Sequence, residues 1–486
     1  MHHDNAGFQY DPNDSASPPA RAEKAALDLA GSASVKKGTA MATSQPLPMK
    51  SVSGKSRDAE ADDYDPFDNR ELDHPLTNFD ALFHMMKASC GSGILAMPQA
   101  FFHAGWALGL GGTAAIGFLC TYCVHILIQS EYAICKRRRV PSLNYHEIAR
   151  EGFLEGPPIF KKLSKVAERS VHVALGIYEI GSCAVYTVFV SDNLSQVAEQ
   201  YGAKLDIRLY MCILLLPLIL INYIRNLKYL APFSSFSLVA TIIAFGVVLS
   251  YIFKDLPNIS TVEPVGEVQN WPLFFGTVIF ALEAIGVVVP LGNEMRRPRE
   301  YLGKFGVLNR GMVPIVMLYV FLGFFGYLKY GSNAMASITL NLPQDEIPAQ
   351  VVKILIAIAI FGTHPLQCYV VIDIVWGTYL QPRFLKHNHV LFIEYVVRTA
   401  LVLLAFIFAV AVPNLGPIIS LVGALSLSVV GIMLPALIQL STFWYQTHGL
   451  AFKWLLTKNA LLAVFAVIGL VSGTYASIVD IIATYA

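Results

Sequence analysis

Long apolar segments, separated by shorter polar stretches, recur along the chain from Phe79 to the C-terminus. Each segment is about 20 residues long, which is the length an α-helix needs to cross the ~30 Å hydrocarbon core of a bilayer. The pattern predicts an all-α integral membrane protein of about eleven transmembrane helices. We expect these helices, numbered 1 to 11 in chain order, at residues 79–102, 106–131, 171–198, 209–224, 231–253, 272–292, 311–330, 348–378, 391–412, 417–441 and 455–482.

The composition agrees with a membrane protein and excludes several other classes. Hydrophobic residues make up 55% of the chain and charged residues only 14%, against about 25% charged in soluble proteins. A net charge of +1 leaves no basic face for phosphates, so nucleic acid is not an expected partner. The seven cysteines lie in or beside predicted helices, so we expect no disulfide framework, no metal site and no cofactor. We expect the chain to lie in a lipid bilayer.

The first 74 residues differ from the rest of the chain. They are rich in Ala, Ser, Asp and Lys and contain few large apolar residues, and such a segment cannot bury enough surface to offset its ordering entropy. We therefore expect a disordered cytosolic tail at 1–74 and an eleven-helix domain at 75–486. Within the tail, Tyr64-Asp65-Pro66-Phe67 resembles an endosomal sorting signal. This pattern makes an endosomal or lysosomal membrane an alternative to the plasma membrane.

Lys and Arg are concentrated in alternate connections between the predicted helices. Cytoplasmic loops carry the excess of these residues in membrane proteins, so we expect the N-terminus in the cytosol and the C-terminus on the extracellular or lumenal side. Asn258-Ile259-Ser260 then lies in an external loop, where Asn258 is a candidate N-glycosylation site. The basic residues of these connections are Lys136, Arg137, Arg138, Arg139, Arg150, Lys161, Lys162, Lys165, Arg169, Arg225, Lys228, Arg296, Arg297, Arg299, Lys304, Arg383, Lys386, Lys453 and Lys458.

Helix 1 is interrupted by Gly91-Ser92-Gly93 at mid-membrane depth. Two glycines around a serine weaken a helix and free backbone groups, which membranes tolerate only beside a polar cavity or within protein. A second half-helix that begins near Gly93 would place unpaired N–H groups and a positive dipole end there, which suits a carboxylate. The alternative is a glycine seam for close helix packing. The candidate substrate-binding residues of this break are Ser89, Gly91, Ser92, Gly93 and Ile94.

Helix 6 shows a second interruption, where the candidate substrate-binding residues are Phe280, Ala281, Glu283 and Gly286. An ionisable side chain such as Glu283 in mid-span is costly unless it faces a cavity or a partner, so it is also a candidate for proton coupling. The alternative is a structural hydrogen bond that pins the unwound stretch. Because helix 6 follows helix 1 by five helices, the two breaks predict a five-plus-five inverted repeat with broken helices 1 and 6 around a central site.

His84 is the second candidate for proton coupling. It lies about two turns before the first break, and Lys87 and Gly91 follow it at the i+3 and i+7 spacing of one helix face. An imidazole titrates at about pH 6.5, and Lys87, if charged and close, would lower the affinity of His84 for a proton. The alternative is a structural histidine. Glu394 and Arg398, four residues apart in helix 9, are expected to pair with each other.

Three stretches carry a family resemblance. They are 78–98, with its histidine, lysine and Gly-Ser-Gly, 274–291 in helix 6, and 185–193 in helix 3. Together they resemble the proton-coupled amino acid transporters, close to the insect members, over residues 73–485. The resemblance implies the amino acid/auxin permease group of the amino acid–polyamine–organocation superfamily and a leucine-transporter-like fold. It also implies proton-driven symport of small neutral amino acids such as glycine, alanine or proline, with His84 handling the proton.

The two breaks suggest alternating access around one central site. The substrate carboxylate would meet backbone N–H groups of the first break, and its ammonium would meet carbonyl groups of the second. The proton is the coupling ion in this hypothesis. Two alternatives stay open: a sodium-coupled neutral amino acid carrier, and an amino acid sensor that signals through partners of its N-terminal tail. An enzyme is not expected, since the chain has no G-x-S-x-G, H-E-x-x-H or P-loop pattern.

Overall fold

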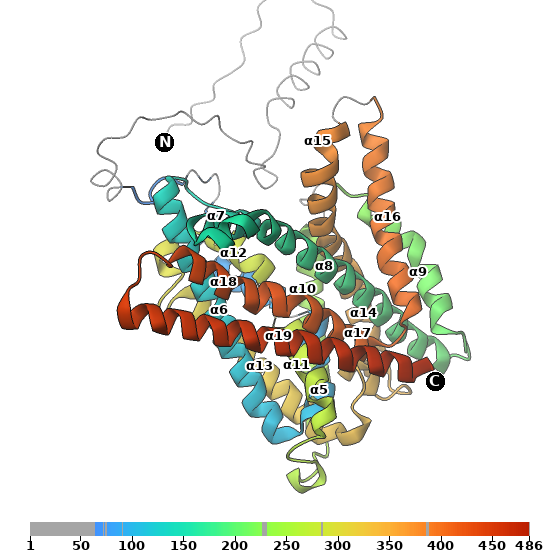
Figure 1. Cartoon of the computed structure of the whole chain (residues 1–486). Coiled ribbons are helices and arrows are strands. Elements are labelled where there is room, and N and C mark those ends of the chain that lie inside the picture. Colours follow the sequence, from blue (N-terminus) through green and yellow to red (C-terminus); the bar gives the residue numbers. More distant parts are fainter. Residues whose placement is uncertain are drawn as a thin grey trace, which may run out of the picture. The chain divides into compact units, whose positions relative to one another are not determined.

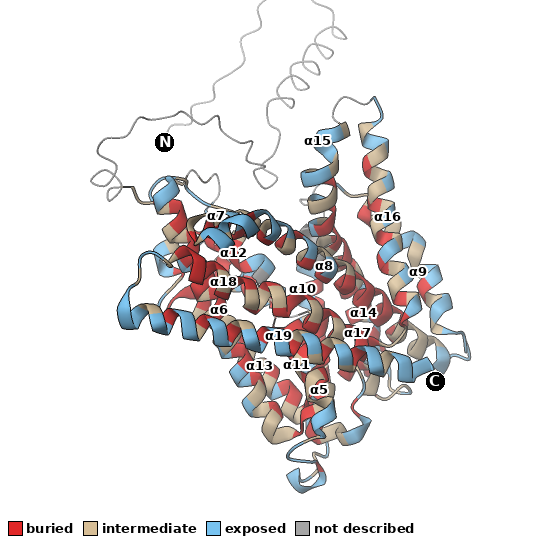
Figure 2. Ribbon diagram, in the orientation of Figure 1, coloured by how far each residue is buried: buried red, intermediate tan, exposed pale blue. Residues whose placement is uncertain are grey.

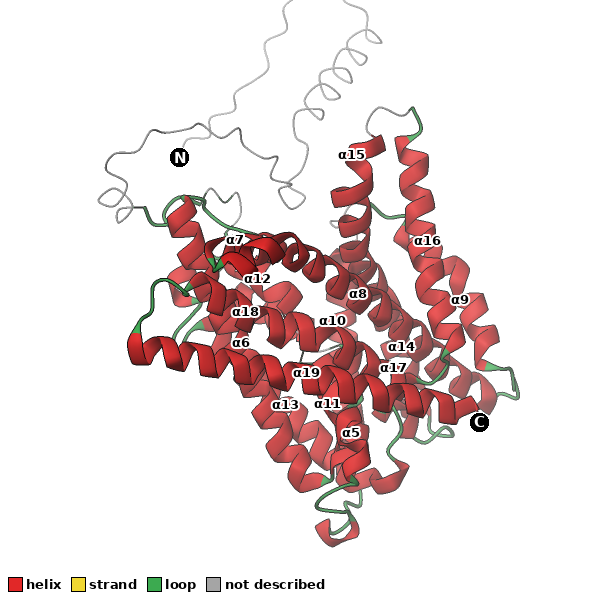
Figure 3. Cartoon of the chain, in the orientation of Figure 1, coloured by secondary structure: helices red, strands yellow, loops and turns green. Residues whose placement is uncertain are grey.

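Helices make up nearly all the regular structure in the described part of the chain (Figures 1 and 3). Apolar segments of membrane length require this, because a helix satisfies its own backbone hydrogen bonds in lipid. The structure is a computed structural model that describes residues 64–70, 72, 75–89, 91–225, 231–282, 285–384 and 388–485. All of these residues belong to one unit that begins at Ala61. Within them, the only bridge of β type is an isolated one between Leu76 and Met295.

Short 3-10 helices and two π-helical stretches accompany the α-helices. The α-helices are α3 (Asn78–Ser89), α4 (Ser92–Leu95), α5 (Met97–Ala104), α6 (Trp106–Arg138), α7 (Tyr145–Glu155), α8 (Pro158–Gln200), α9 (Ile207–Asn222), α10 (Ala231–Phe253), α11 (Trp271–Ala281), α12 (Ile285–Glu294), α13 (Val307–Tyr330), α14 (Ile347–Ile372), α15 (Gln381–Phe384), α16 (Val390–Ala411), α17 (Leu415–Val422), α18 (Leu434–Thr442) and α19 (Gly449–Tyr485). The 3-10 helices are η2 (Ile259–Thr261), η3 (Val268–Asn270), η4 (Pro298–Glu300), η5 (Gly331–Asn333) and η6 (Ile338–Asn341). The π-helices are η7 (Asp373–Leu380), which continues α14, and η8 (Gly423–Met433), between α17 and α18.

All eleven predicted segments coincide with helices of the structure. Among the described residues, nine helices are long and apolar enough to cross a membrane. Two predicted helices are not in that count, since helix 4 is the 16-residue α9 and helix 1 is divided into α3, α4 and α5. The prediction of a multi-pass, all-helical membrane protein is confirmed.

Two helix boundaries differ most from the prediction. Helix 3 is the 43-residue α8, which begins at Pro158 rather than at residue 171. Helix 2 ends at Arg138 rather than at residue 131. Both extensions are rich in Lys and Arg, and both α6 and α8 pack against α7. An apolar window stops where the charged residues start, so hydropathy cannot detect such extensions.

Residues 64–70, which the sequence assigns to a disordered tail, pack against the helical domain instead. Pro66 is buried, and the guanidinium of Arg70 donates to the carbonyl of Gly292 at 3.0 Å. The tail prediction is wrong for these residues, because Pro66 and Phe67 make apolar contacts with the domain. Residues 1–63 lie outside the described part of the chain.

The helices bury one face inside the domain and leave an apolar face outside (Figure 2). On α10, α16 and α19, the side chains of Ile242, Ile407 and Val471 are 62%, 61% and 62% exposed. Soluble proteins rarely expose apolar surface on this scale. Contact with lipid tails accounts for it, since these helices need no polar partners on their outer faces.

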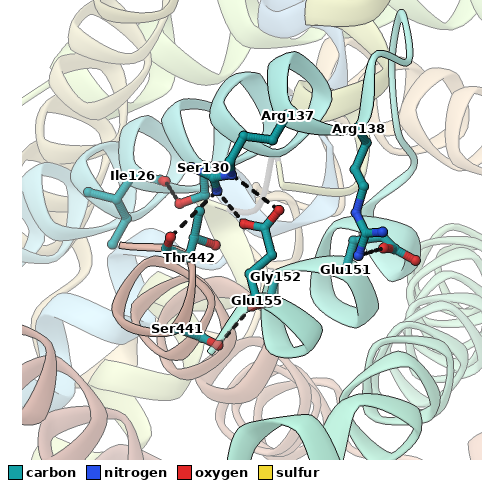
Figure 4. Close-up of polar contacts among 9 residues, drawn as sticks. All are labelled: Ile126, Ser130, Arg137, Arg138, Glu151, Gly152, Glu155, Ser441 and Thr442. Carbon is teal, nitrogen blue, oxygen red and sulfur yellow. Dashed lines mark hydrogen bonds and ion pairs between the residues drawn. The ribbon is translucent and has the colours of Figure 1, made fainter. Parts of the chain in front are cut away.

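The connection between α6 and α8 is held in place by polar contacts of α7 (Figure 4). Arg137 at the end of α6 pairs with Glu155 at the end of α7. The hydroxyl of Ser441 in α18 donates to the carbonyl of Gly152 at 2.8 Å. Helix α7 is thus fixed to both α6 and α18, at the end of the domain that carries the basic loops.

A buried ion pair joins α16 to the end of α9. A carboxylate oxygen of Glu394 accepts a hydrogen bond from Nε of Arg398 at 3.0 Å and one from Nε of Arg225 at 2.9 Å. Arg398 also donates to the carbonyl of Asn222 at 2.9 Å. Glu394 and Arg398 are each only 4% exposed. The predicted pairing of these two residues is confirmed.

Glu394→Gln is expected to destabilise the protein by about 3–5 kcal/mol, because it leaves two buried or half-buried guanidinium groups without their counter-charge. The measurement is the thermal unfolding temperature of the purified protein. Arg297→Gln is the matched control, since the Arg297–Glu300 pair is 70% and 46% exposed and such pairs contribute about 1 kcal/mol at most. Equal unfolding temperatures for the two variants would contradict a structural role of the Glu394 pair.

Candidate functional site

The first helical break lies where the sequence places it. Helix α3 ends at Ser89 and α4 begins at Ser92, while Cys90 lies outside the described residues. Gly91 precedes α4 with extended backbone angles, φ −95° and ψ −157°. The N–H groups of the first α4 turn therefore have no intrahelical acceptor. The residues of this turn are buried: Ser92, Gly93 and Ile94.

The second break begins at the end of α11. This helix ends at Ala281, where the N–H of Leu282 bonds to the carbonyl of Val278 at 2.9 Å. The next helix, α12, begins at Ile285. Glu283, predicted both for substrate binding and for proton coupling, lies outside the described residues. The last carbonyl groups of α11 are available to partners other than their own helix.

The two breaks are in direct contact. A methyl group added to Gly93 would lie 2.6 Å from Cα of Ala281 and 3.1 Å from its Cβ, so only a glycine permits this approach. Helix α11 also packs against α4 and α5, and Figure 1 shows α5 beside α11. Phe280 is buried next to Ala281. The structure thus brings together the two interruptions that the repeat pattern predicts.

Tyr319 of α13 connects the two breaks. Its hydroxyl is directed at the carbonyl of Ser89, the last residue of α3, and at the carbonyl of Ala281, the last residue of α11, the latter at 2.8 Å. The side chain is 0% exposed. A phenol carries one proton, so at any moment it can donate to only one of the two carbonyl groups. The other carbonyl can then accept a hydrogen bond from a bound ligand.

Sequence reasoning did not find Tyr319. The available signal is a tyrosine in the middle of an apolar span, because a buried hydroxyl needs a hydrogen-bond partner. That signal does not say which helix supplies the partner. The bonds of Tyr319 cross 230 and 38 residues of sequence, so only the folded chain identifies them.

Further polar groups lie at the same point. Ser89 is 3% exposed, and its hydroxyl has no hydrogen-bond partner among the described residues. The hydroxyl of Tyr186, on α8, would lie 3.7 Å from a methyl group added to Gly91. An unsatisfied buried hydroxyl is unusual in native structures. It fits a site that a polar ligand completes.

His84 lies apart from this contact. The buried residues of α3 are Ala81, Met85 and Ser89, whereas His84 is on the exposed side of the helix. The expectation that His84 and Gly91 share one helix face is wrong, because α3 ends at Ser89, before Gly91. The role of His84 in proton coupling stays a prediction.

Two other candidates occupy exposed positions. Gly286 is in the first turn of α12 and is exposed. Asn258 is exposed in the connection between α10 and α11, where its side-chain oxygen accepts from the N–H of Ser260 at 3.2 Å. Glycosylation of Asn258 stays a prediction.

The helical domain matches the family model of transmembrane amino acid transporter proteins over residues 74–479. The chain is 40% identical, over 424 residues, to the proton-coupled amino acid transporter-like protein pathetic of Drosophila melanogaster, with 87% of this chain and 89% of that protein covered. It is 28% identical, over 433 residues, to the amino acid transporter AVT3C of Arabidopsis thaliana, with 84% and 92% covered. The solved inward-facing conformation of Mhp1 is similar in fold, with a TM-score of 0.51 at 16% identity and with 85% and 93% of the two chains covered.

The chain belongs to the transmembrane amino acid transporter family. It is a multi-pass amino acid transporter with a leucine-transporter-like fold, and not an enzyme. The fold class and the family resemblance expected from the sequence are both confirmed.

Proposed function

We propose that the protein carries small neutral amino acids together with protons by alternating access, and that the substrate binds where the two helical breaks meet. The observation that supports this site most strongly is the contact of Gly93 with Ala281, with Tyr319 bonded to the last carbonyl groups of α3 and α11. In transporters built on inverted repeats, discontinuous helices supply free backbone groups of this kind to substrates at mid-membrane depth.

A zwitterionic amino acid fits the chemistry of the two breaks. Its carboxylate pairs with the N–H groups of Ser92 and Gly93, which have no intrahelical acceptor. The unpartnered hydroxyl of Ser89 supplies a further donor. The ammonium group of the substrate donates to the carbonyl of Ala281, while the hydroxyl of Tyr319 donates to the carbonyl of Ser89. Both charged ends are then paired, as burial away from water requires.

The walls of this site favour a small side chain. Gly93 and Ala281 are in van der Waals contact, Phe280 is buried beside them, and its ring lies 5.8 Å from that of Tyr178. A large substrate side chain would have to displace these packed groups, and overpacking a close-packed interior is unfavourable. Glycine, alanine and proline are therefore the proposed substrate class.

Protons are the proposed driving ion, with His84 as their carrier. Symport of one proton with a zwitterion moves one net charge, so the membrane potential contributes about 2.3 kcal/mol per 100 mV. Each unit of pH difference contributes about 1.4 kcal/mol more. The exposed position of His84 on α3 supports exchange of its proton with an aqueous compartment. The relative from Drosophila is named as a proton-coupled transporter-like protein.

His84→Ala is expected to lose the inward current that single amino acids evoke at acid external pH, because no carrier then couples the proton to the substrate. The measurement is a current screen across individual amino acids in cells that express the protein, with sodium replaced by choline. His389→Ala is the control, since His389 is an exposed histidine that precedes α16. A normal current from His84→Ala would remove His84 from the mechanism, and a current that needs sodium would favour sodium coupling.

A further inference from the structure

The segment Tyr64–Arg70 lies in a groove between α6 and the end of α12. It borders a cavity of about 190 Å³ whose walls include Tyr132 and Cys135 of α6, Asn293 of α12 and Tyr301. Pro66 is buried, and the ring of Phe67 lies 4.8 Å from that of Tyr132. Proline and phenylalanine thus supply the apolar part of this contact, which accounts for the packing of a segment that is otherwise polar.

The segment is folded into a turn. The side chain of Asp65 accepts a hydrogen bond from the N–H of Phe67 at 2.9 Å, and the side chain of Asn69 donates to the carbonyl of Asp65 at 2.8 Å. Aspartate and asparagine commonly stabilise turns through bonds of this kind. The backbone therefore has a defined shape that places Phe67 and Arg70 on the transporter domain.

Arg70 caps the end of the second broken helix. Its guanidinium donates to the carbonyl groups of Gly292 at 3.0 Å and Asn293 at 3.4 Å, in the last turn of α12, and to that of Pro141 at 3.1 Å. The last carbonyl groups of a helix have no intrahelical donor, and a cation is favourable at that end of the helix dipole. Arg70 also lies 4.9 Å above the ring of Phe67, so one side chain joins the turn, α12 and the connection after α6.

Two ion pairs hold the segment to the connection after α12. Arg299 lies 2.7 Å from Asp65 and 2.9 Å from Asp68. Burial tends to raise the pKa of the Asp65 carboxyl, but the bond from the N–H of Phe67 and the neighbouring Arg299 outweigh it, so this pKa lies below its ordinary value. Asp65 therefore stays charged at neutral pH and keeps its ion pair.

The chain leads from this segment directly into α3. Leu76 forms a bridge to the residues after α12: its N–H donates to the carbonyl of Glu294 at 2.8 Å, and its carbonyl accepts from the N–H of Arg296 at 2.9 Å. Asn78, the first residue of α3, hydrogen-bonds to Glu300. The first half of broken helix 1 is thus tied to the last half of broken helix 6.

We propose that residues 64–70 and 75–78 form a latch, a part of the chain that occupies the groove between α6 and α12 and holds the start of α3 against the end of α12. The latch closes the end of the domain that carries the basic loops. Since α3 leads into the first break, separation of α3 from α12 at this end requires the latch to detach. The latch is defined by the fold and by these contacts, whichever substrate the protein carries.

The test measures thiol labelling with a fluorescent maleimide, on protein purified into lipid nanodiscs. Cys135 is 1% exposed beside the cavity and reports docking when the other six cysteines are replaced by alanine. Ala81, at 0% exposure on α3, reports the position of α3 when Ala81→Cys is made in a cysteine-free chain. Removal of residues 1–63 should leave both labelling rates unchanged. Removal of residues 1–70 should raise both labelling rates about tenfold, since the two thiols then become accessible through local opening of the domain.

Two controls separate detachment of the latch from general loosening. Cys123 is 0% exposed in the same helix as Cys135, and as the sole cysteine it should label equally slowly in both truncated chains. Arg299→Asp should raise labelling of Cys135 about two- to fivefold, as expected for loss of exposed ion pairs. Adding Asp65→Arg and Asp68→Arg to that variant should restore the slow rate.

Three results would overturn the latch. One is a rate at Ala81→Cys that does not change when residues 1–70 are removed. The second is a rise at Cys123 equal to the rise at Cys135. The third is failure of the exchanged charges to restore slow labelling.

Discussion

Gly93→Ala is expected to reduce amino acid transport at least about fivefold. The added methyl group would lie 2.6 Å from Cα of Ala281, and no flexible side chain is there to move aside. The two breaks must then separate, at a packing cost of about 1–3 kcal/mol. Because the substrate needs both breaks at once, a cost of this size weakens its binding about five- to 150-fold. The measurement is initial-rate uptake as a function of substrate concentration.

Gly111→Ala is the matched control for Gly93→Ala. Gly111 is on α6, and a methyl group added there meets nothing within 4 Å. Alanine also has the higher helix propensity, so this variant should express and transport normally. Normal uptake by Gly93→Ala, at equal amounts of protein in the membrane, would show that the close contact of the two breaks is not part of the substrate site.

Tyr319→Phe is expected to raise the KM for amino acid uptake about tenfold. The substitution keeps the ring but removes the donor shared by the carbonyl groups of Ser89 and Ala281. A buried polar group left without its partner costs about 1–3 kcal/mol. Here the groups left without a donor are carbonyl groups of the two breaks, so the substitution weakens the arrangement that binds the substrate. Because the aromatic packing is retained, we expect the larger effect on KM rather than on the amount of folded protein.

Tyr475→Phe separates the loss of a specific hydroxyl from the loss of any tyrosine. Tyr475 is on α19 and is 71% exposed, so its replacement should leave uptake unchanged. An unaltered KM in Tyr319→Phe would mean that its hydroxyl acts only in packing α13 and has no part in substrate binding. A substrate analogue without the amino group gives a second comparison, since it lacks the ammonium that competes with Tyr319 for the carbonyl of Ala281.

The sequence predicts the arrangement of the fold closely, because its determinants are local. Apolar length locates the helices, and the Gly91–Gly93 interruption appears in the structure as the gap between α3 and α4. The i, i+4 spacing of Glu394 and Arg398 is enough to predict their pair. These features depend on neighbours along one helix, for which spacing and residue type are sufficient.

The parts that could not be predicted depend on contacts between distant segments. Tyr319 acquires its role only because α13 passes both breaks. The spacing of His84 and Gly91 places them on one face only if a single helix contains both. Helix α3 ends at Ser89, so this condition is not met. Residues 64–70 have the composition of a disordered tail, yet Arg70 finds carbonyl groups 222 and 223 residues away. Composition indicates how much apolar surface a segment can bury by itself. It does not indicate which contacts the segment makes with distant parts of the chain.

In our proposal, small neutral amino acids cross the membrane with protons through the site between the two breaks. The most direct measurement is uptake of radiolabelled glycine, alanine and proline into proteoliposomes, with Gly93→Ala vesicles as the blank. We predict that an acid exterior drives accumulation above equilibrium without sodium, and that a protonophore abolishes this accumulation. Uptake that is indifferent to the pH gradient, or that matches the Gly93→Ala blank, would contradict the claim.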